Sequence, residues 1–119
     1  MEQAPLISQD QIQYLKNLGG DKLLKKMIHS FLNHTPQKVD LMKTAVLTLD
    51  YETLSTSAHF LSSSSGNLGA TRLFNLTKEI EQLANDEKEH ELLAKMDLFF
   101  ITYDQVKSFF ETMKLELSE

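Results

Sequence analysis

Hydrophobic residues recur at intervals of three and four residues along most of the chain. The clearest run lies between residues 92 and 117, where apolar side chains alternate steps of four and three without interruption. This spacing places all of them on one face of a single long helix. Such a stripe is typical of the seam in a helix bundle or coiled coil, so we expect it to be buried.

Capping and helix-breaking residues divide the first half of the chain into shorter predicted helices. We expect a first helix over residues 8–18, which Ser8 would cap and the glycine pair at 19–20 would end. Asp21 would cap a second helix. A third is predicted to begin at Thr35-Pro36, because proline is favoured at the first position of a helix.

Two more helices are predicted between residues 50 and 86. Asp50 would cap the first of them, and Gly66 and Gly69 mark its bend or break. The inward-facing stripe of this helix is Leu54, Ala58, Leu61 and Ser65. The second helix has its own apolar stripe and ends near Asn85. Because short connections favour antiparallel neighbours, the predicted fold is all-α, an up-down helix bundle.

Composition and charge narrow the classes of function. With 119 residues, no internal repeat and no long linker, the chain is expected to form one domain over residues 1–119. The absence of cysteine excludes disulfides, thiolate metal sites and a cysteine nucleophile. A net charge of −5, with only a small lysine cluster at Lys22, Lys25 and Lys26, argues against nucleic-acid binding.

The sequence gives no indication of membrane insertion or export. No apolar stretch approaches the roughly 20 residues that a membrane helix needs. The first five residues, Met1-Glu2-Gln3-Ala4-Pro5, contain no basic stretch followed by an apolar run, so no signal peptide is predicted. We therefore expect a cytoplasmic protein that does not bind membranes.

His59 is the leading candidate for chemistry. The residues three, four and seven positions away share its helix face, and all are polar or small: Glu52, Ser55, Thr56, Ser62, Ser63 and Gly66. We therefore expect an exposed imidazole beside a flat patch of small side chains that another protein can approach closely. A neutral imidazole is nucleophilic and can attack a phosphoryl group in line. Helix geometry alone does not establish a function, however, because most exposed histidines have none.

The residues around His59 carry a motif that changes this balance. Segment 54–70 reads LSTSAHFLSSSSGNLGA and joins an Ala-His pair to a distal Leu-Gly-Ala at fixed spacing. The segment resembles the signature of histidine-containing phosphotransfer (HPt) domains, which is roughly A-H-x-L-K-G-S-x-x-x-L-G-A. The matching residues are Ala58, His59, Leu61, Ser64, Leu68, Gly69 and Ala70.

The resemblance implies a four-helix bundle with additional short N-terminal helices. It implies that His59 is the phosphoacceptor and exchanges the phosphoryl group with an aspartate on the receiver domain of a response regulator or hybrid sensor histidine kinase. No ATP-dependent kinase activity and no cofactor are expected, since Mg²⁺ would be required by the receiver domain and not by this chain. We expect a monomer. No metal site is expected, because His29 and His34 are five residues apart and lack the spacing of a helical zinc pair.

Two residues that follow the histidine depart from the family signature. Ser62 stands where the family usually has lysine, so a positive charge near the phosphoryl group is missing. Ser63 stands where the family usually has glycine, and its hydroxyl would donate a hydrogen bond to a phosphoryl oxygen. The site is therefore predicted at His59 with an altered surrounding.

The following helix offers substitutes for the missing lysine. Many family members have a glutamine about 22 residues after the histidine, and this chain has Glu81 there, followed by Gln82. Lys78 lies one turn earlier on the same face as Glu81. We hypothesise that Lys78 partly replaces the missing lysine and that Glu81 hydrogen-bonds the imidazole. The alternative is a simple surface ion pair between them, worth well under about 1 kcal/mol.

Phe60 lies at the edge of the predicted exposed face. It either folds onto the neighbouring helix or anchors a receiver domain. Ser55, Thr56 and Gly66 would complete the docking surface around the histidine. Residues at the start of the chain would extend it: Leu6, Ile7, Ile12 and Leu15. Because Ser62 removes a charge, the alternative function is a degenerate HPt-like adaptor that binds receiver domains without efficient phosphotransfer.

Overall fold

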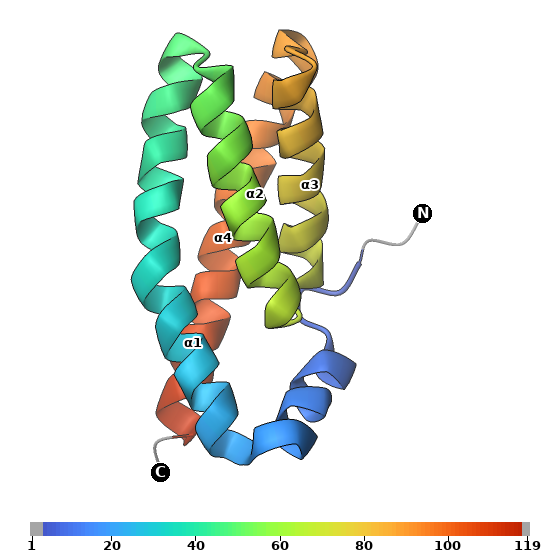
Figure 1. Ribbon diagram of the computed structural model, residues 1–119, viewed down its shortest axis with the longest axis vertical. Helices are drawn as coiled ribbons and strands as arrows, with labels where there is room; N and C mark the ends of the chain where they lie inside the picture. Colours follow the sequence, from blue (N-terminus) through green and yellow to red (C-terminus); the bar gives the residue numbers. More distant parts are fainter. Residues whose placement is uncertain (1–3, 118–119) are drawn as a thin grey trace.

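Four long helices pack side by side in an up-down bundle (Figure 1). In chain order they are α1 (Gln9–Thr48), α2 (Tyr51–Asn67), α3 (Thr71–Asn85) and α4 (Glu89–Leu117). Each helix packs against its neighbours in the chain, and α4 closes the bundle against α1. This computed structural model describes residues 4–117. Met1, Glu2 and Gln3, which were part of the sequence used to predict that there is no signal peptide, lie outside the described residues. The predicted all-α fold is confirmed.

A sharp kink divides α1 at the predicted glycine stop. Ser8 caps the helix as expected, because its hydroxyl accepts a hydrogen bond from the Gln11 backbone N–H at 3.2 Å. Gly20 has a φ of 72°, in the left-handed region that other residues rarely adopt. The segment before it therefore turns away from the rest of α1 and lies at one end of the bundle (Figure 1, blue). A backbone hydrogen bond from Ser8 to the Gly69 carbonyl (2.7 Å) ties this segment to the end of α2.

The predicted helix start at Thr35-Pro36 is wrong, because α1 continues through both residues. Proline has no backbone N–H, so one hydrogen bond of the helix is lost here. Two contacts of the buried Thr35 hydroxyl offset this loss. It donates to the Phe31 carbonyl at 2.8 Å and lies 2.8 Å from the Tyr103 hydroxyl of α4. Packing against α4 therefore keeps this stretch of α1 helical.

Local interactions fix both ends of α2, as predicted. The Asp50 carboxylate accepts hydrogen bonds from the Thr53 hydroxyl (2.6 Å) and the Thr53 backbone N–H (3.2 Å), and these bonds lower the pKa of its carboxyl. At the other end the chain turns at Gly69, whose φ is 76°. Because α3 also begins and ends close to its predicted bounds, the sequence locates both helices that form the site.

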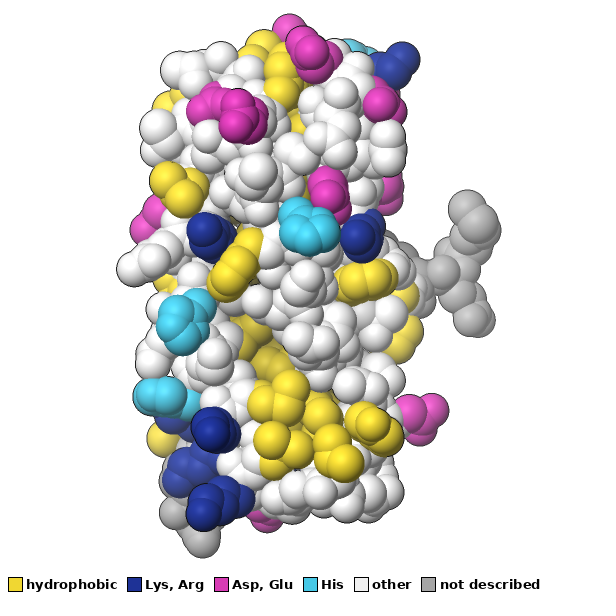
Figure 2. Space-filling view, in the orientation of Figure 1, with side chains coloured by type: hydrophobic (Ala, Val, Ile, Leu, Met, Phe, Trp, Pro, Cys, Tyr) yellow, Lys and Arg dark blue, Asp and Glu magenta, His cyan; other side chains and the backbone are white. Residues whose placement is uncertain are grey.

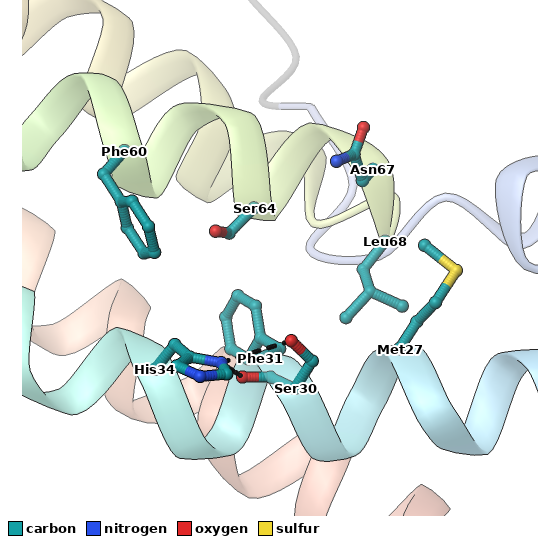
Figure 3. A pocket seen from close by; sticks show the side chains of 8 residues that line it. All are labelled: Met27, Ser30, Phe31, His34, Phe60, Ser64, Asn67 and Leu68. Atoms are coloured by element: carbon teal, nitrogen blue, oxygen red, sulfur yellow. Dashed lines mark hydrogen bonds between the residues drawn. The ribbon is translucent and has the colours of Figure 1, made fainter.

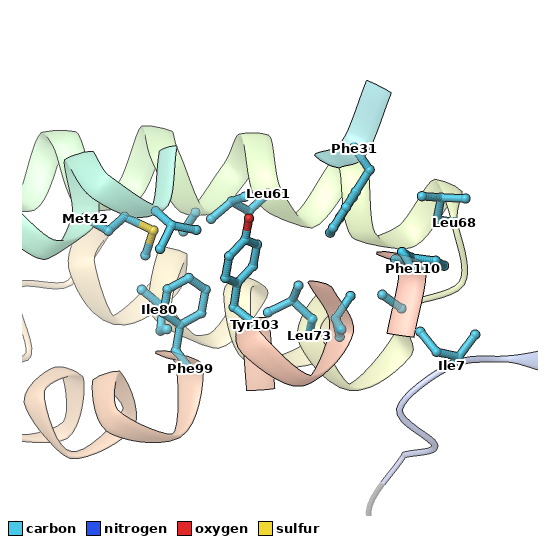
Figure 4. Close-up of a cluster of buried hydrophobic side chains, with 14 of the residues drawn as sticks. Ile7, Phe31, Met42, Leu61, Leu68, Leu73, Ile80, Phe99, Tyr103 and Phe110 are labelled. Carbon is cyan, nitrogen blue, oxygen red and sulfur yellow. The ribbon is translucent and has the colours of Figure 1, made fainter. Parts of the chain in front are cut away.

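An apolar core runs along the bundle (Figure 4). The α4 stripe lies in this core as predicted, with six residues buried and two partly buried: Leu92, Met96, Phe99, Tyr103, Val106 and Phe110, then Met113 and Leu117. The whole predicted α2 stripe is buried as well. Within residues 4–117, no helix combines the length and the apolar character needed to cross a membrane.

The predicted extension of the docking surface by the start of the chain is wrong. Ile7, Ile12 and Leu15 are buried, and Leu6 is partly buried against the core. The kink in α1 folds these side chains onto the end of the bundle, where they cover the core. Ile7, Ile12 and Leu15 are therefore unavailable to a partner, and Leu6 packs against the core with part of its side chain.

Candidate functional site

His59 projects from the middle of α2 into solvent, as predicted. The apolar stripe of α2 is fully buried, which turns the opposite side of the helix outward. The His59 side chain is 63% exposed. Figure 2 shows histidine side chains exposed on this face of the molecule, with lysine or arginine side chains among them. The imidazole is therefore accessible to another protein.

One ring nitrogen of His59 is held by a carboxylate from α3. His59 Nδ1 lies 3.0 Å from Glu81 Oε2, which is the hydrogen bond that we hypothesised. A carboxylate oxygen only accepts, so Nδ1 must carry the hydrogen. In the neutral ring the lone pair is then on Nε2, at the opposite side of the ring, and Nε2 has no hydrogen-bond partner among residues 4–117. The ring is thus held with Nε2 as the nucleophilic atom.

Lys78 and Gln82 on α3 make contacts with other side chains. Lys78 Nζ lies 3.6 Å from Glu81 Oε1, so the surface ion pair that was the alternative interpretation is present. Gln82 donates from its amide nitrogen to Asp86 Oδ2 at 2.9 Å. Consecutive side chains on a helix point about a quarter of a turn apart, so Gln82 does not point in the same direction as Glu81. Its side chain bonds to Asp86 on the same helix and not to the imidazole.

Ser62 does not lie on the exposed face, and that expectation is wrong. Its side chain is only 1% exposed, and its hydroxyl donates to the His59 carbonyl at 2.8 Å. The reason is that α2 packs against both α1 and α3, so its buried face is wider than the apolar stripe alone indicates. Ser63 is exposed, as expected.

The rest of the predicted docking patch lies beside α3. Thr56 is exposed, and Ser55 is half-buried with its hydroxyl donating to Asn85 Oδ1 at 2.6 Å. Gly66 is exposed, but a β-carbon there would lie 3.1 Å from the Phe74 ring. The glycine therefore makes room for Phe74, a partly buried side chain near the site that the sequence argument missed.

Phe60 lies on the other side of His59, toward α1. Its ring is 37% exposed and points into a hollow of about 160 Å³ between α1 and α2 (Figure 3). The lining residues are Met27, Ser30, Phe31, His34, Phe60, Ser64, Asn67 and Leu68. Lys38 Nζ lies 5.0 Å above the Phe60 ring, within the range of a cation–π contact. Phe60 thus packs toward α1 and also keeps an exposed face.

Lys38 and His34 are site neighbours that the sequence argument did not identify. Both lie on α1, more than 20 residues before His59, and only the packing of α1 on α2 brings them to the site. His34 contacts its own helix, with Nδ1 lying 2.8 Å from the Ser30 carbonyl. Across residues 4–117, no three histidine, aspartate or glutamate side chains are grouped so as to hold a metal ion.

Comparison with known proteins agrees with this geometry. A model of the Hpt domain matches residues 26–117. The fold is similar to the crystal structure of histidine-containing phosphotransfer protein B from Pseudomonas aeruginosa PAO1, with a TM-score of 0.85 at 19% identity, over 95% of this chain and 97% of that chain. Comparison with curated proteins found no match. Because the family model covers most of the helical bundle, including His59, the chain belongs to the Hpt domain family.

Proposed function

We propose that His59 accepts a phosphoryl group from the aspartate of one receiver domain and passes it to another. Membership of the Hpt domain family supports a histidine phosphotransfer role in phosphorelay. The observation that carries the assignment to His59 is its exposed ring, held at Nδ1 by Glu81 so that Nε2 has the lone pair. The protein is then a phosphorelay intermediate in two-component signalling.

The chemistry requires little more than an accessible nucleophile. The Nε2 lone pair attacks the phosphorus of the aspartyl phosphate in line, the bond from phosphorus to the aspartate oxygen breaks, and the aspartate leaves as a carboxylate. The reverse attack returns the group to a second aspartate. Mg²⁺ would belong to the receiver domain, where it balances the charge of the phosphoryl oxygens. Catalysis therefore rests on positioning two proteins.

Several side chains around His59 are positioned to support this exchange. The Ser63 hydroxyl is exposed one turn from the histidine and would donate to a phosphoryl oxygen. Lys78 would supply positive charge, although Glu81 already balances part of it. We assign receiver docking to Phe60 on one side of His59 and to Ser55, Thr56 and Gly66 along α2. The partner is a response regulator or hybrid sensor histidine kinase, bound by a monomer of this chain.

One observation favours the adaptor as the second candidate function. Where family members usually have a lysine, the Ser62 side chain is buried and its hydroxyl is bound to the His59 carbonyl. This position therefore offers nothing to a phosphoryl group. A protein with such a site would bind receiver domains and transfer phosphoryl groups slowly.

Incubation with a panel of phosphorylated receiver domains distinguishes the two functions. We expect label on this protein that is acid-labile and base-stable, as phosphohistidine is. The label should be lost in His59→Gln and retained in His34→Gln, a matched control at an exposed histidine of α1. Binding without transfer would support the adaptor, and the absence of both would contradict the proposal.

A further inference from the structure

We propose that the outward face of α4 is a second docking surface, separate from the site at His59. Its occupant is an amphipathic helix of a partner protein, with lysine or arginine beside an apolar stripe. The surface lies on the opposite side of the bundle from His59, so this partner and a receiver domain can be bound at the same time. The role of α4 is independent of phosphotransfer.

Apart from its buried stripe, α4 has a second stripe that points into solvent. Its members follow one another at steps of four and three, are all exposed and carry no charge: Ala94, Leu98, Ile101, Gln105, Ser108 and Thr112. Leu98 is 41% exposed and Ile101 is 56% exposed, and Leu115 continues the stripe. The outward face of a bundle helix usually carries charged side chains, whereas an uncharged stripe of this period is what one helix presents to another.

A groove runs beside the second half of this stripe. It has a volume of about 370 Å³ and is lined by residues of α4 and by Leu6 from the start of the chain. Phe109 and Met113 line it and are both half-buried. They add apolar surface where the stripe itself has only Ser108 and Thr112. A helix laid along α4 would therefore bury apolar side chains over the whole length of the stripe.

The charges beside the stripe are acidic. One edge carries three exposed carboxylates at intervals of seven residues, which places them in one row: Asp97, Asp104 and Glu111. The lysines of α4 are half-buried, and two of them contact neighbouring helices. Lys95 Nζ lies 3.0 Å from Glu79 on α3, and Lys114 Nζ lies 3.1 Å from His29 Nδ1 on α1. The surface thus matches a helix that carries basic residues at seven-residue intervals.

The same row of carboxylates argues against a second copy of this chain as the occupant. A twofold dimer through α4 would place identical faces against each other. Every acidic residue of α4 is exposed and every lysine of α4 is half-buried, so the exposed charges that meet would be negative on both sides. Like charges across an interface oppose association. A partner of opposite charge is therefore favoured over self-association.

The position of α4 in the bundle keeps His59 accessible. α4 packs against α1 and α3 and lies behind α2, without contacting it (Figure 1). Its buried stripe faces the core, so its outward face points away from α2. A helix bound there would leave His59 and the exposed face of Phe60 uncovered.

Three synthetic helical peptides, each about three heptads long, test the proposal. The first has leucine and isoleucine in its stripe and lysine on both edges. The second has glutamate in place of lysine, and the third keeps lysine but has glutamine in the stripe. Like charges on both edges keep each peptide monomeric. Each is added to ¹⁵N-labelled protein, and NMR measures the affinity and locates the residues whose signals move.

The first peptide should bind at least about tenfold more tightly than the other two, and it should move signals of the outward face of α4 but not those of His59. Ile101→Gln should weaken this binding about tenfold, whereas Leu47→Gln, at an exposed apolar site on α1, should leave it unchanged. The double variant Asp97→Asn, Asp104→Asn should weaken it about two- to fivefold and reduce its salt dependence. Glu52→Gln, at an exposed carboxylate on α2, is the matched control for charge.

The remaining results would overturn the proposal. They are equal affinities for the three peptides, signal changes centred on α2, and binding that Ile101→Gln does not weaken. Sedimentation equilibrium of the protein alone gives a further test, because a dimer that Ile101→Gln dissociates would assign the face to a second copy. None of these measurements involves a phosphoryl group, so failure of phosphotransfer at His59 would leave the result for α4 standing.

Discussion

Ser65 is a buried serine whose removal should stabilise the protein. Its side chain is fully buried in α2, and its hydroxyl has no hydrogen-bond partner among the described residues. A buried hydroxyl without a partner costs about 1–3 kcal/mol in desolvation. Alanine keeps the β-carbon, and it has the higher helix propensity by up to about 0.5 kcal/mol. The atom that is lost leaves a small void, so we expect Ser65→Ala to raise the free energy of unfolding by about 1–2 kcal/mol.

Ser62→Ala is the matched control for this prediction. Ser62 is equally buried on the same helix, but its hydroxyl donates to the His59 carbonyl, so its removal loses a hydrogen bond. We expect this variant to be neutral or destabilised by up to about 1 kcal/mol. Urea unfolding followed by circular dichroism measures both values, and Ser65→Ala should also raise the melting temperature by about 4–8 °C. Equal or opposite effects of the two substitutions would refute the reasoning, because they would mean that the Ser65 hydroxyl is satisfied.

Three further predictions concern α4 and the site. Burial raises the pKa of Tyr103, so the stability due to its neutral hydroxyl is present at pH 7 and is lost as the pH rises above about 10. Tyr103→Phe should lower the free energy of unfolding by about 1 kcal/mol at pH 7, and urea unfolding at pH 7 and 10.5 should show this difference shrinking. Phe60→Ala should weaken receiver binding about tenfold in calorimetry, whereas Leu98→Ala, at an apolar site on α4 of similar exposure (41% against 37%), should not; unchanged affinity would remove Phe60 from the docking surface. Lys78→Ala should slow transfer severalfold in rapid-quench assays relative to Lys95→Ala, and equal rates would leave Lys78 with only its ion pair to Glu81.

Local sequence signals predicted the helices where one cap or one stripe decides the outcome. The caps at Ser8 and Asp50 are both confirmed, because an N-cap depends on residues within one turn. The predicted break at Thr35-Pro36 failed because contact with Tyr103, which is 68 residues away from Thr35, outweighs a local preference. A helix signal is thus reliable until a tertiary contact opposes it.

The exposed position of His59 and its hydrogen bond to Glu81 were predicted from the sequence, but the placement of neighbouring side chains was not. The motif located the histidine, and a fixed distance along the chain located the carboxylate that the structure places 3.0 Å from it. Lys38 was missed because no periodicity relates α1 to α2, and Ser62 was misplaced because the pattern shows polarity and not the width of a packed face. Both errors concern how neighbouring helices meet.

The charges around His59 come from the helices on either side of it. α2 contributes the imidazole but no cation within the exposed patch, since Ser62 replaces the usual lysine and is buried. Lys38 is supplied by α1, and Lys78 and Glu81 are supplied by α3. The electrostatics of the site therefore depend on the packing of α2 against both neighbours. It follows that a substitution in the interface between α2 and α3 can alter the distance from Nδ1 to the carboxylate, and so the chemistry, without changing either residue.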